Sequence, residues 1–221
     1  MMVVIIYDSC HSQCRSTNEP KGLERVANDV RQRMIDHAVV LLAQKGLQGA
    51  SFNEVLQASG APRGSLYHHF PGGKAELALA AMDAAGQRAE AFLGPVRGQP
   101  ADKVAEAFIA LWRAVLTRSG FEAGCAVLAV TVTSESSELR DRAGRIFRTW
   151  RALLADILSE GGVPPDRADG LAAMLISVCE GAVALSRAEG SLAPFELAVA
   201  EQLRAVRGAM IGSSSRPDIA I

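Results

Sequence analysis

The sequence has few aromatic residues, few cysteines and no excess of either charge. Only 5% of its 221 residues are aromatic, four are cysteine, and 23 Lys and Arg face 24 Asp and Glu, giving a formal net charge of -1. Balanced charge excludes a histone-like protein that holds nucleic acid by bulk charge. Any contact with nucleic acid must therefore depend on a local cluster of basic and hydrogen-bonding side chains.

The cysteines fall into two kinds, and neither kind predicts a disulfide framework. Cys10 and Cys14 flank His11 in a polar N-terminal segment, whereas Cys125 and Cys179 lie among apolar residues and are expected to be buried. The CHSQC stretch would supply half of a zinc site, but no second Cys/His pair follows at a suitable spacing. We therefore expect neither a metal nor a cofactor.

The sequence also lacks membrane, export and catalytic signatures. No apolar run approaches the roughly 18 residues of a membrane span, and the opening residues lack the charged start of a signal peptide. Gly-x-Ser-x-Gly, His-Glu-x-x-His and phosphate-binding glycine loops are missing. These absences favour a cytoplasmic protein without membrane contact that is not an enzyme.

Helical periodicity runs through most of the chain and predicts an all-α fold. A first helix begins near Val26 and ends at Gly46, where a left-handed residue is expected. Ser51 to Glu54 fits a capping box that starts a short second helix, which ends at Gly60. Pro62 suits the first position of a third helix, which runs to Phe70. Two short helices joined by a tight turn predict a helix-turn-helix.

The rest of the chain reads as a larger helical scaffold. Helices are expected over residues 75–93, 101–119, 137–160, 166–189 and from 194 onward, and residues 125–133 predict a buried, irregular helix. The helix over 166–189 is apolar on nearly its whole circumference and should be buried on every side. This pattern favours a homodimer formed by the last two long helices, with a monomer core helix as the alternative.

The stretch GAPRGSLYHHFPGGK, residues 60–74, combines chain breakers with cationic and aromatic residues. In the second helix of a helix-turn-helix, the N-terminal residues face base edges in the major groove. Arg63 could then contact guanine, Gly64 would permit close approach of DNA, and Ser65 could bond to a base or phosphate.

Helical spacing assigns the remaining residues of this stretch to two faces. Leu66 and Phe70 should face inward, while the other faces hold polar side chains that can donate to phosphate oxygens, namely Tyr67, His68 and His69. Lys74 adds a charge just past the helix end. The alternative is that the tyrosine and the two histidines are ordinary surface residues.

The segment SFNEVLQASGAPRGSLYHHFPGGK, residues 51–74, resembles the DNA-binding motif of TetR-family transcriptional regulators. The matching positions are Ser51, Gly60, Gly64, Leu66, Tyr67, His69, Phe70 and Lys74. Three departures from the common pattern are Pro62 in place of a Ser cap, Leu56 in place of Ala, and a longer connection before Lys74. These departures resemble the branch of the family that includes the lincomycin-resistance repressor LmrA.

The resemblance implies a division of labour along the chain. The composition of the two ends predicts a disordered extension, or an upstream start codon wrongly chosen, over 1–24 and a disordered tail over 212–221. The resemblance implies a helix-turn-helix DNA-binding domain over 25–72 and a C-terminal ligand-binding and dimerisation domain over 73–211. It also implies a repressor that binds a palindromic double-stranded DNA operator and is released by an unidentified small effector. The residues expected to contact DNA are Ser51, Arg63, Gly64, Ser65, Tyr67, His68, His69 and Lys74.

Effector contacts do not follow from the resemblance, because the pocket varies within the family. Apolar stripes suggest a mostly apolar effector, and the candidate lining residues are Phe108, Trp112, Cys125, Phe147, Trp150 and Met174. The alternative, which the apolar stripes favour for each of these residues, is an ordinary core position. Two alternatives stay open: a thiol-based redox sensor using Cys125 or Cys179, and an all-α enzyme.

Overall fold

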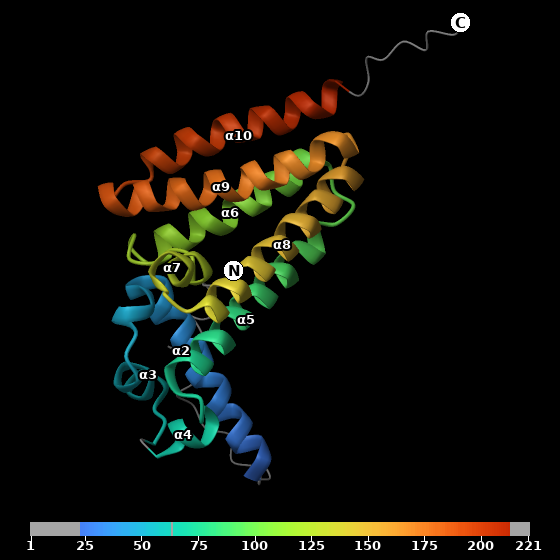
Figure 1. The fold of residues 1–221 in the computed structure, drawn as a ribbon. Coiled ribbons are helices and arrows are strands. Elements are labelled where there is room, and N and C mark those ends of the chain that lie inside the picture. The colour runs from blue at the N-terminus through green and yellow to red at the C-terminus, as the bar shows by residue number, and fades with distance from the viewer. Residues whose placement is uncertain (1–22, 63, 213–221) are drawn as a thin grey trace, which may run out of the picture. The chain divides into compact units, whose positions relative to one another are not determined.

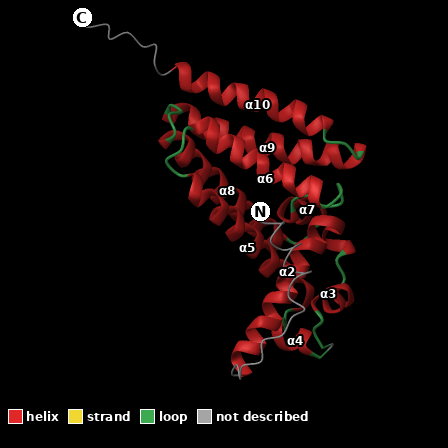
Figure 2. Cartoon of the chain, turned by 180° about the vertical axis from the view of Figure 1, so that it is seen from behind, coloured by secondary structure: helices red, strands yellow, loops and turns green. Residues whose placement is uncertain are grey.

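The computed structural model describes residues 23–62 and 64–212. Every regular element in these ranges is a helix, which confirms the all-α prediction (Figure 1, Figure 2). The predicted extension with Cys10, His11 and Cys14, the predicted tail beyond 212, and Arg63 lie outside the described residues. The chain divides into two compact units, each interrupted in sequence: Met1–Arg88 with Ala123–Ile146, and Ala89–Glu122 with Phe147–Ile221.

The first unit is built around α2, Leu23–Gly49, which packs against α3 and α7. Gly46 interrupts α2 with a left-handed φ of 67°, so the long helix ends where the sequence predicts and a short turn follows. The core contains the fully buried side chains of Met34, Phe70 and Met82. The unit's other helical segments are α3 (Phe52–Ser59), α4 (Ser65–His69), the start of α5 (Gly73–Leu93), α7 (Ala126–Thr133) and the start of α8 (Ser137–Glu160).

The start of the third helix differs from the prediction. Pro62 is not its first residue; α4 begins three residues later, at Ser65. The Ser65 N–H and hydroxyl both donate to the Pro62 carbonyl, at 3.0 and 2.6 Å, so Pro62 precedes the helix and is bonded to its first residue. The N-cap residue of α4 is Gly64, which offers no side-chain oxygen to the first N–H groups of the helix, so the bonds from Ser65 to Pro62 fix the start of α4 instead.

The second unit contains the 3₁₀ turn η1 (Gly94–Val96), α6 (Ala101–Arg118), α9 (Pro165–Glu189) and α10 (Ala193–Gly212). Its three long helices pack against one another. Gly161 closes the unit at one end, where its carbonyl accepts the Ala101 N–H at 2.9 Å. A Cβ at this position would lie 2.6 Å from backbone atoms of Gln99 and Ala101, so only glycine fits.

Helix α9 corrects one expectation. Among the described residues it is long and apolar enough to cross a membrane by length and composition, although no such run was expected. The prediction that it is buried on every side depends on a partner copy, and within one chain Met174 and Leu185 are exposed. Its other face packs on α6 and α10, so α9 is a core helix of this unit with one apolar face uncovered.

Candidate DNA-binding site

The start of α3 is fixed by the predicted capping box. Ser51 accepts the Glu54 N–H on its hydroxyl oxygen at 3.2 Å, and its own N–H donates to Glu54 Oε2 at 3.1 Å. The Glu54 carboxylate also pairs with Lys45 of α2, and this ammonium group and the Ser51 donors lower the pKa of Glu54 to about 2. The carboxylate is thus ionised throughout the physiological pH range.

The end of α3 is fixed by Gly60 and by a second side chain of α2. Gly60 adopts left-handed φ/ψ angles of 65° and 19°, and its N–H donates to the Leu56 carbonyl. Arg33 Nε donates to the Ser59 carbonyl at 3.3 Å, while its Nη1 pairs with Asp29 at 2.7 Å. The turn between α3 and α4 therefore begins from a well-defined helix end.

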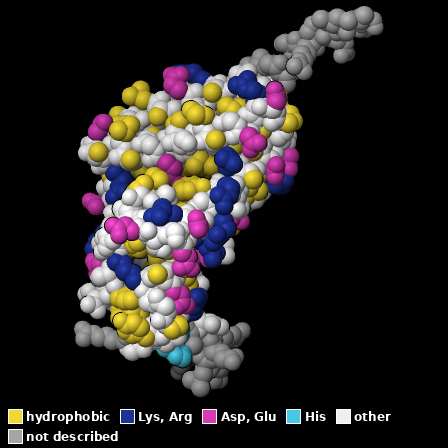
Figure 3. Space-filling view, in the orientation of Figure 1, with side chains coloured by type: hydrophobic (Ala, Val, Ile, Leu, Met, Phe, Trp, Pro, Cys, Tyr) yellow, Lys and Arg dark blue, Asp and Glu magenta, His cyan; other side chains and the backbone are white. Residues whose placement is uncertain are grey.

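Helix α4 divides its side chains as the sequence predicts. Leu66 and Phe70 are 2% and 0% exposed, and they anchor the helix in the core. Tyr67 is 67% exposed, and its ring meets the edge of Phe52 at 6.2 Å between centroids. Figure 3 shows hydrophobic side chains gathered over α3 and α4, with histidine side chains at the same end. Tyr67 and the exposed His68 thus remain available to a partner.

His69 lies at the edge of this core. Its ring meets that of His68 at 5.1 Å, and the guanidinium of Arg31 lies 5.0 Å from the centre of the Phe70 ring. Burial lowers the pKa of His69, and the neighbouring His68 and Arg31 lower it further. The His69 imidazole is consequently neutral at pH 7 and can donate one hydrogen bond without carrying charge.

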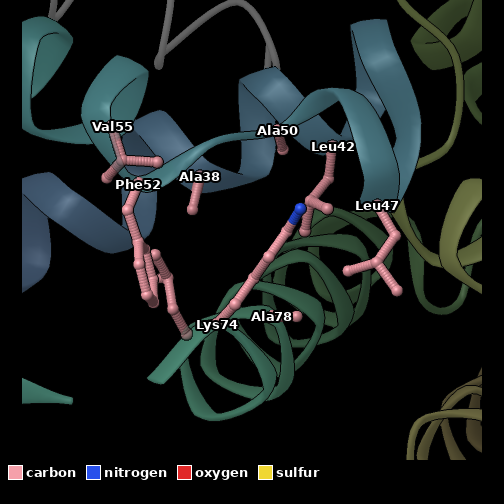
Figure 4. A pocket seen from close by; sticks show the side chains of 9 residues that line it. Ala38, Leu42, Leu47, Ala50, Phe52, Val55, Lys74 and Ala78 are labelled. Carbon is pink, nitrogen blue, oxygen red and sulfur yellow. The ribbon is translucent and has the colours of Figure 1, made fainter. Parts of the chain in front are cut away.

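Lys74 lies in the first turn of α5, over an apolar notch between α2, α3 and α5 (Figure 4). Its aliphatic stem crosses the notch, and its ammonium donates to the Gln48 carbonyl at 3.4 Å. The notch has about 10 Å³ of free space, room for one water at most. Figure 4 therefore shows a packing site for the lysine stem, with its charge at the end of α2.

The structure places the DNA-contact candidates that it describes in one part of the first unit. Ser51 starts α3, Gly64 and Ser65 start α4, and Tyr67, His68 and His69 follow within that helix. The sequence did not predict the roles of Arg33, Lys45 and Phe52. Arg33 and Lys45 of α2 contact the two ends of α3, and Phe52 of α3 contacts Tyr67 of α4. Of these three residues, only Lys45 could have been predicted from the sequence, because a cation shortly before a capping box can pair with the acidic residue of that box.

The effector candidates are spread over both units. Cys125 caps α7 in the first unit, where its sulfur accepts the Leu128 N–H at 3.3 Å. The other five lie in the second unit: Phe108, Trp112 and Trp150 are buried, Phe147 is partly buried, and Met174 is 52% exposed. The indole N–H of Trp112 is buried without a hydrogen-bond partner among the described residues.

A groove of about 430 Å³ runs between α6 and α10, but none of the six candidates lines it. Its floor includes Ile109 and Val199, and a bidentate ion pair between Arg113 and Glu196, at 2.5 and 2.9 Å, crosses one end. Elsewhere in this unit, burial raises the pKa of the Cys179 thiol, and the nearby Glu180 raises it further. A buried thiol that stays protonated is a poor redox sensor.

Models of known families match both halves of the chain. Residues 34–81 match the model described as bacterial regulatory proteins of the tetR family. Residues 100–202 match the C-terminal domain of LmrA/YxaF-like transcriptional regulators. The first match covers α3 and α4, so it includes the cap, the turn and the exposed tyrosine described above.

Known proteins resemble the chain over most of its length. It is 37% identical over 193 residues to an HTH-type transcriptional regulator of Mycobacterium tuberculosis, covering 84% of this chain and 98% of that one. It is 30% identical over 182 residues to the regulator YxaF of Bacillus subtilis, covering 79% and 93%. A TetR regulator structure from Chloroflexus aurantiacus matches with a TM-score of 0.70 at 26% identity, covering 83% and 96%. By its motif, its fold and these relatives, the chain belongs to the TetR family of transcriptional regulators.

Proposed function

We propose that the chain binds a specific double-stranded DNA operator through α3 and α4. The observation that carries this proposal is the division of α4, which buries Leu66 and Phe70 and exposes Tyr67 and His68 beside the glycine-containing turn. A helix anchored in this way can enter a major groove while Leu66 and Phe70 stay buried in the hydrophobic core of the first unit. Arg63, Gly64 and Ser65 would face base edges, and His69 and Lys74 would lie near the phosphate backbone. Ser51 would act by capping α3, because its N–H and its hydroxyl proton are both donated to Glu54.

The proposed functional form is a homodimer that uses α9 and α10. The exposed face of α9 carries no charged residue along 19 positions and consists of Gly170, Met174, Ser177, Gly181, Ala184, Leu185 and Ala188. Exposed apolar faces of this length usually mark an interface, and small residues let two helices approach closely. Figure 3 displays hydrophobic side chains along α9 and α10. A partner copy of this face would cover Met174 and Leu185.

The dimer supports a repressor mechanism in the cytoplasm. Two copies of α4 about 34–36 Å apart would read the two halves of a palindromic operator. A small, mostly apolar effector bound in the second unit would favour a spacing that does not fit DNA. Trp112 supports this location, because its indole N–H, which has no partner among the described residues, would donate a hydrogen bond to an effector that carries an acceptor. The domain limits proposed are 25–72 for DNA binding and 73–211 for effector binding and dimerisation.

Selection of bound fragments from the protein's own genome tests this function. The selected fragments should share a palindrome, and binding should weaken steeply as salt rises, because phosphate contacts release counterions. Arg63→Ala should reduce discrimination between the selected and scrambled duplexes, whereas the loss of a phosphate contact would weaken both alike. Recovery of no common sequence, or equal affinity for both duplexes in the native protein, contradicts the proposal.

A further inference from the structure

Helix α3 is held at both ends by cations that project from α2. At its N-terminal end, the Lys45 ammonium pairs with Glu54 Oε1. At its C-terminal end, Arg33 Nε donates to the Ser59 carbonyl at 3.3 Å. The two helices pack against each other in the first unit, so both contacts span one interface (Figure 1).

At the N-terminal end of α3, the polar groups of Ser51 and Lys45 are both bonded to the Glu54 carboxylate. Glu54 Oε2 accepts both the Ser51 N–H at 3.1 Å and the Ser51 hydroxyl proton at 2.9 Å, while Oε1 is held by Lys45. A serine hydroxyl has only one proton to donate. Ser51 is therefore engaged as a cap, and the Lys45 charge is balanced by a carboxylate that is ionised at neutral pH.

The C-terminal contact places a charge where the helix favours one. The last carbonyls of a helix lack intrahelical partners and carry partial negative charge, so a guanidinium there is stabilising. Arg33 is itself oriented by Asp29, one turn earlier on α2, through a 2.7 Å ion pair. The residue after Ser59 is Gly60, which begins the turn to α4. The orientation of this turn thus depends on the end of α3 that Arg33 holds.

Movement of α3 would move the DNA-facing side chains. Helix α4 has only five residues, and the exposed Tyr67 leans on Phe52, the first residue of α3. A shift of α3 against α2 would therefore displace Tyr67 relative to a DNA groove. Interfacial geometry must hold to within about 0.5 Å for binding groups to act together.

We propose that Lys45 and Arg33 are positioning residues for DNA binding, which fix α3 on α2 and do not themselves contact phosphate. The inference rests on the proposed operator binding. It assigns a role to two cations that would otherwise be counted among the basic groups facing DNA. In this arrangement the Lys45 ammonium is paired with Glu54, and the Arg33 guanidinium is bonded to the C-terminal end of α3.

Salt dependence separates positioning from direct phosphate contact. Lys45→Met keeps the aliphatic stem and removes the charge, and we expect operator affinity to fall about three- to fivefold with the dependence on salt unchanged. Lys45→Arg should restore native affinity because it keeps the ion pair. A direct phosphate contact would instead reduce the slope of log affinity against log salt by about 0.9. That change in slope, or an unchanged affinity in Lys45→Met, overturns the proposal for Lys45.

Further variants distinguish a positioning role in DNA binding from a general loss of folding stability. Glu54→Gln keeps an oxygen for Ser51 but loses the charge, so it should reproduce the effect of Lys45→Met, and the double variant should lose little more. Arg33→Met should also weaken binding at constant slope. Arg142→Met is the matched control, since it breaks a 3.0 Å ion pair with Asp83 in the same unit, away from α3. Equal loss of affinity in this control would contradict the inference.

All binding is measured by fluorescence anisotropy on one duplex selected from the genome and on its scrambled counterpart. Thermal unfolding of each variant is recorded in parallel, and affinities are compared well below the unfolding temperature. Failure of the native protein to prefer the selected duplex would reject operator binding itself. Preference by the native protein, together with altered slopes in Lys45→Met and Arg33→Met, would reject only the positioning roles.

Discussion

At the scale of single residues, the DNA-facing end of the first unit separates side chains that anchor from side chains that face outward. Leu66 and Phe70 are buried, whereas Tyr67, between them, is largely exposed. Its ring is supported by Phe52, so the phenol hydroxyl is held out from the surface at little entropic cost. In the proposed complex the hydroxyl would donate a hydrogen bond to a phosphate oxygen.

Tyr67→Phe isolates this hydroxyl. The ring and its contact with Phe52 remain, so the thermal unfolding midpoint should stay within about 1 °C of that of the native protein. Operator affinity should fall about fivefold, as for the loss of one hydrogen bond worth about 1 kcal/mol. The measurement is anisotropy on the selected duplex. Native affinity in Tyr67→Phe would exclude a donor role for the hydroxyl.

His69 predicts a dependence of DNA binding on pH. Its pKa is lowered by burial, by His68 and by Arg31, so the ring is neutral at pH 7.5 and gains a proton only in acid. A protonated ring attracts phosphate more strongly, so affinity should rise as the pH falls below 6.5, the ordinary pKa of histidine. His69→Asn should flatten this rise in a binding titration against pH. An identical pH profile in the variant would place the titrating group elsewhere.

At the scale of elements, the ends of α3 determine how the helix-turn-helix is built. Gly60 takes left-handed angles at the turn, and apart from its chain neighbours no described residue has an atom within 4 Å of where a Cβ would be. Gly60→Ala should therefore cost only the backbone strain, about 1 kcal/mol, measured by urea unfolding. Gly60→Asn is the control and should cost less, because asparagine tolerates this conformation. Equal stability of Gly60→Ala and the native protein would contradict the assigned strain.

The capping box of α3 makes a second prediction, concerning acid stability. The pKa of Glu54 is lowered from 4.5 to about 2 in the folded chain, so its ionised form is favoured by folding. The ionised carboxylate therefore adds to the free energy of unfolding above about pH 4.5, and this addition is lost as the pH falls toward 2. The difference in unfolding temperature between the native protein and Glu54→Gln should be largest at neutral pH and vanish near pH 2. A difference independent of pH would show that the charge is unimportant.

At the scale of the whole molecule, the uncovered face of α9 predicts self-association. Met174→Glu and Leu185→Glu each put a charge into the proposed interface, where it would be buried without a partner. Both variants should sediment as monomers with native helical content, and both should lose most operator affinity. Val132→Glu is the control, because Val132 is 71% exposed on α7 and lies outside the proposed interface. Dimers that persist in both α9 variants would contradict this interface.

Much of the fold could be predicted because helix ends and apolar stripes are local signals. The Ser51 capping box, the Gly60 turn and the helix over 137–160 are confirmed at the predicted positions. The start of α4 was predicted wrongly, because proline favours a first helical position but equally suits a position before the helix. Residues 126–133 are helical as predicted, although their β-branched composition also suits a strand. The predicted burial of this segment is wrong at Val132, which is 71% exposed.

By itself, the sequence determined the helical class, the order of the helices and the family, since periodicity, caps and a motif are written in neighbouring residues. The tertiary structure alone decided which side chains meet across the chain. Lys45 reaches Glu54, Arg33 reaches Ser59, and Lys74 lies over an apolar notch and reaches Gln48. It also decided that one face of α9 stays uncovered within a single chain. These outcomes depend on helix packing, which brings together residues whose partners no local pattern identifies.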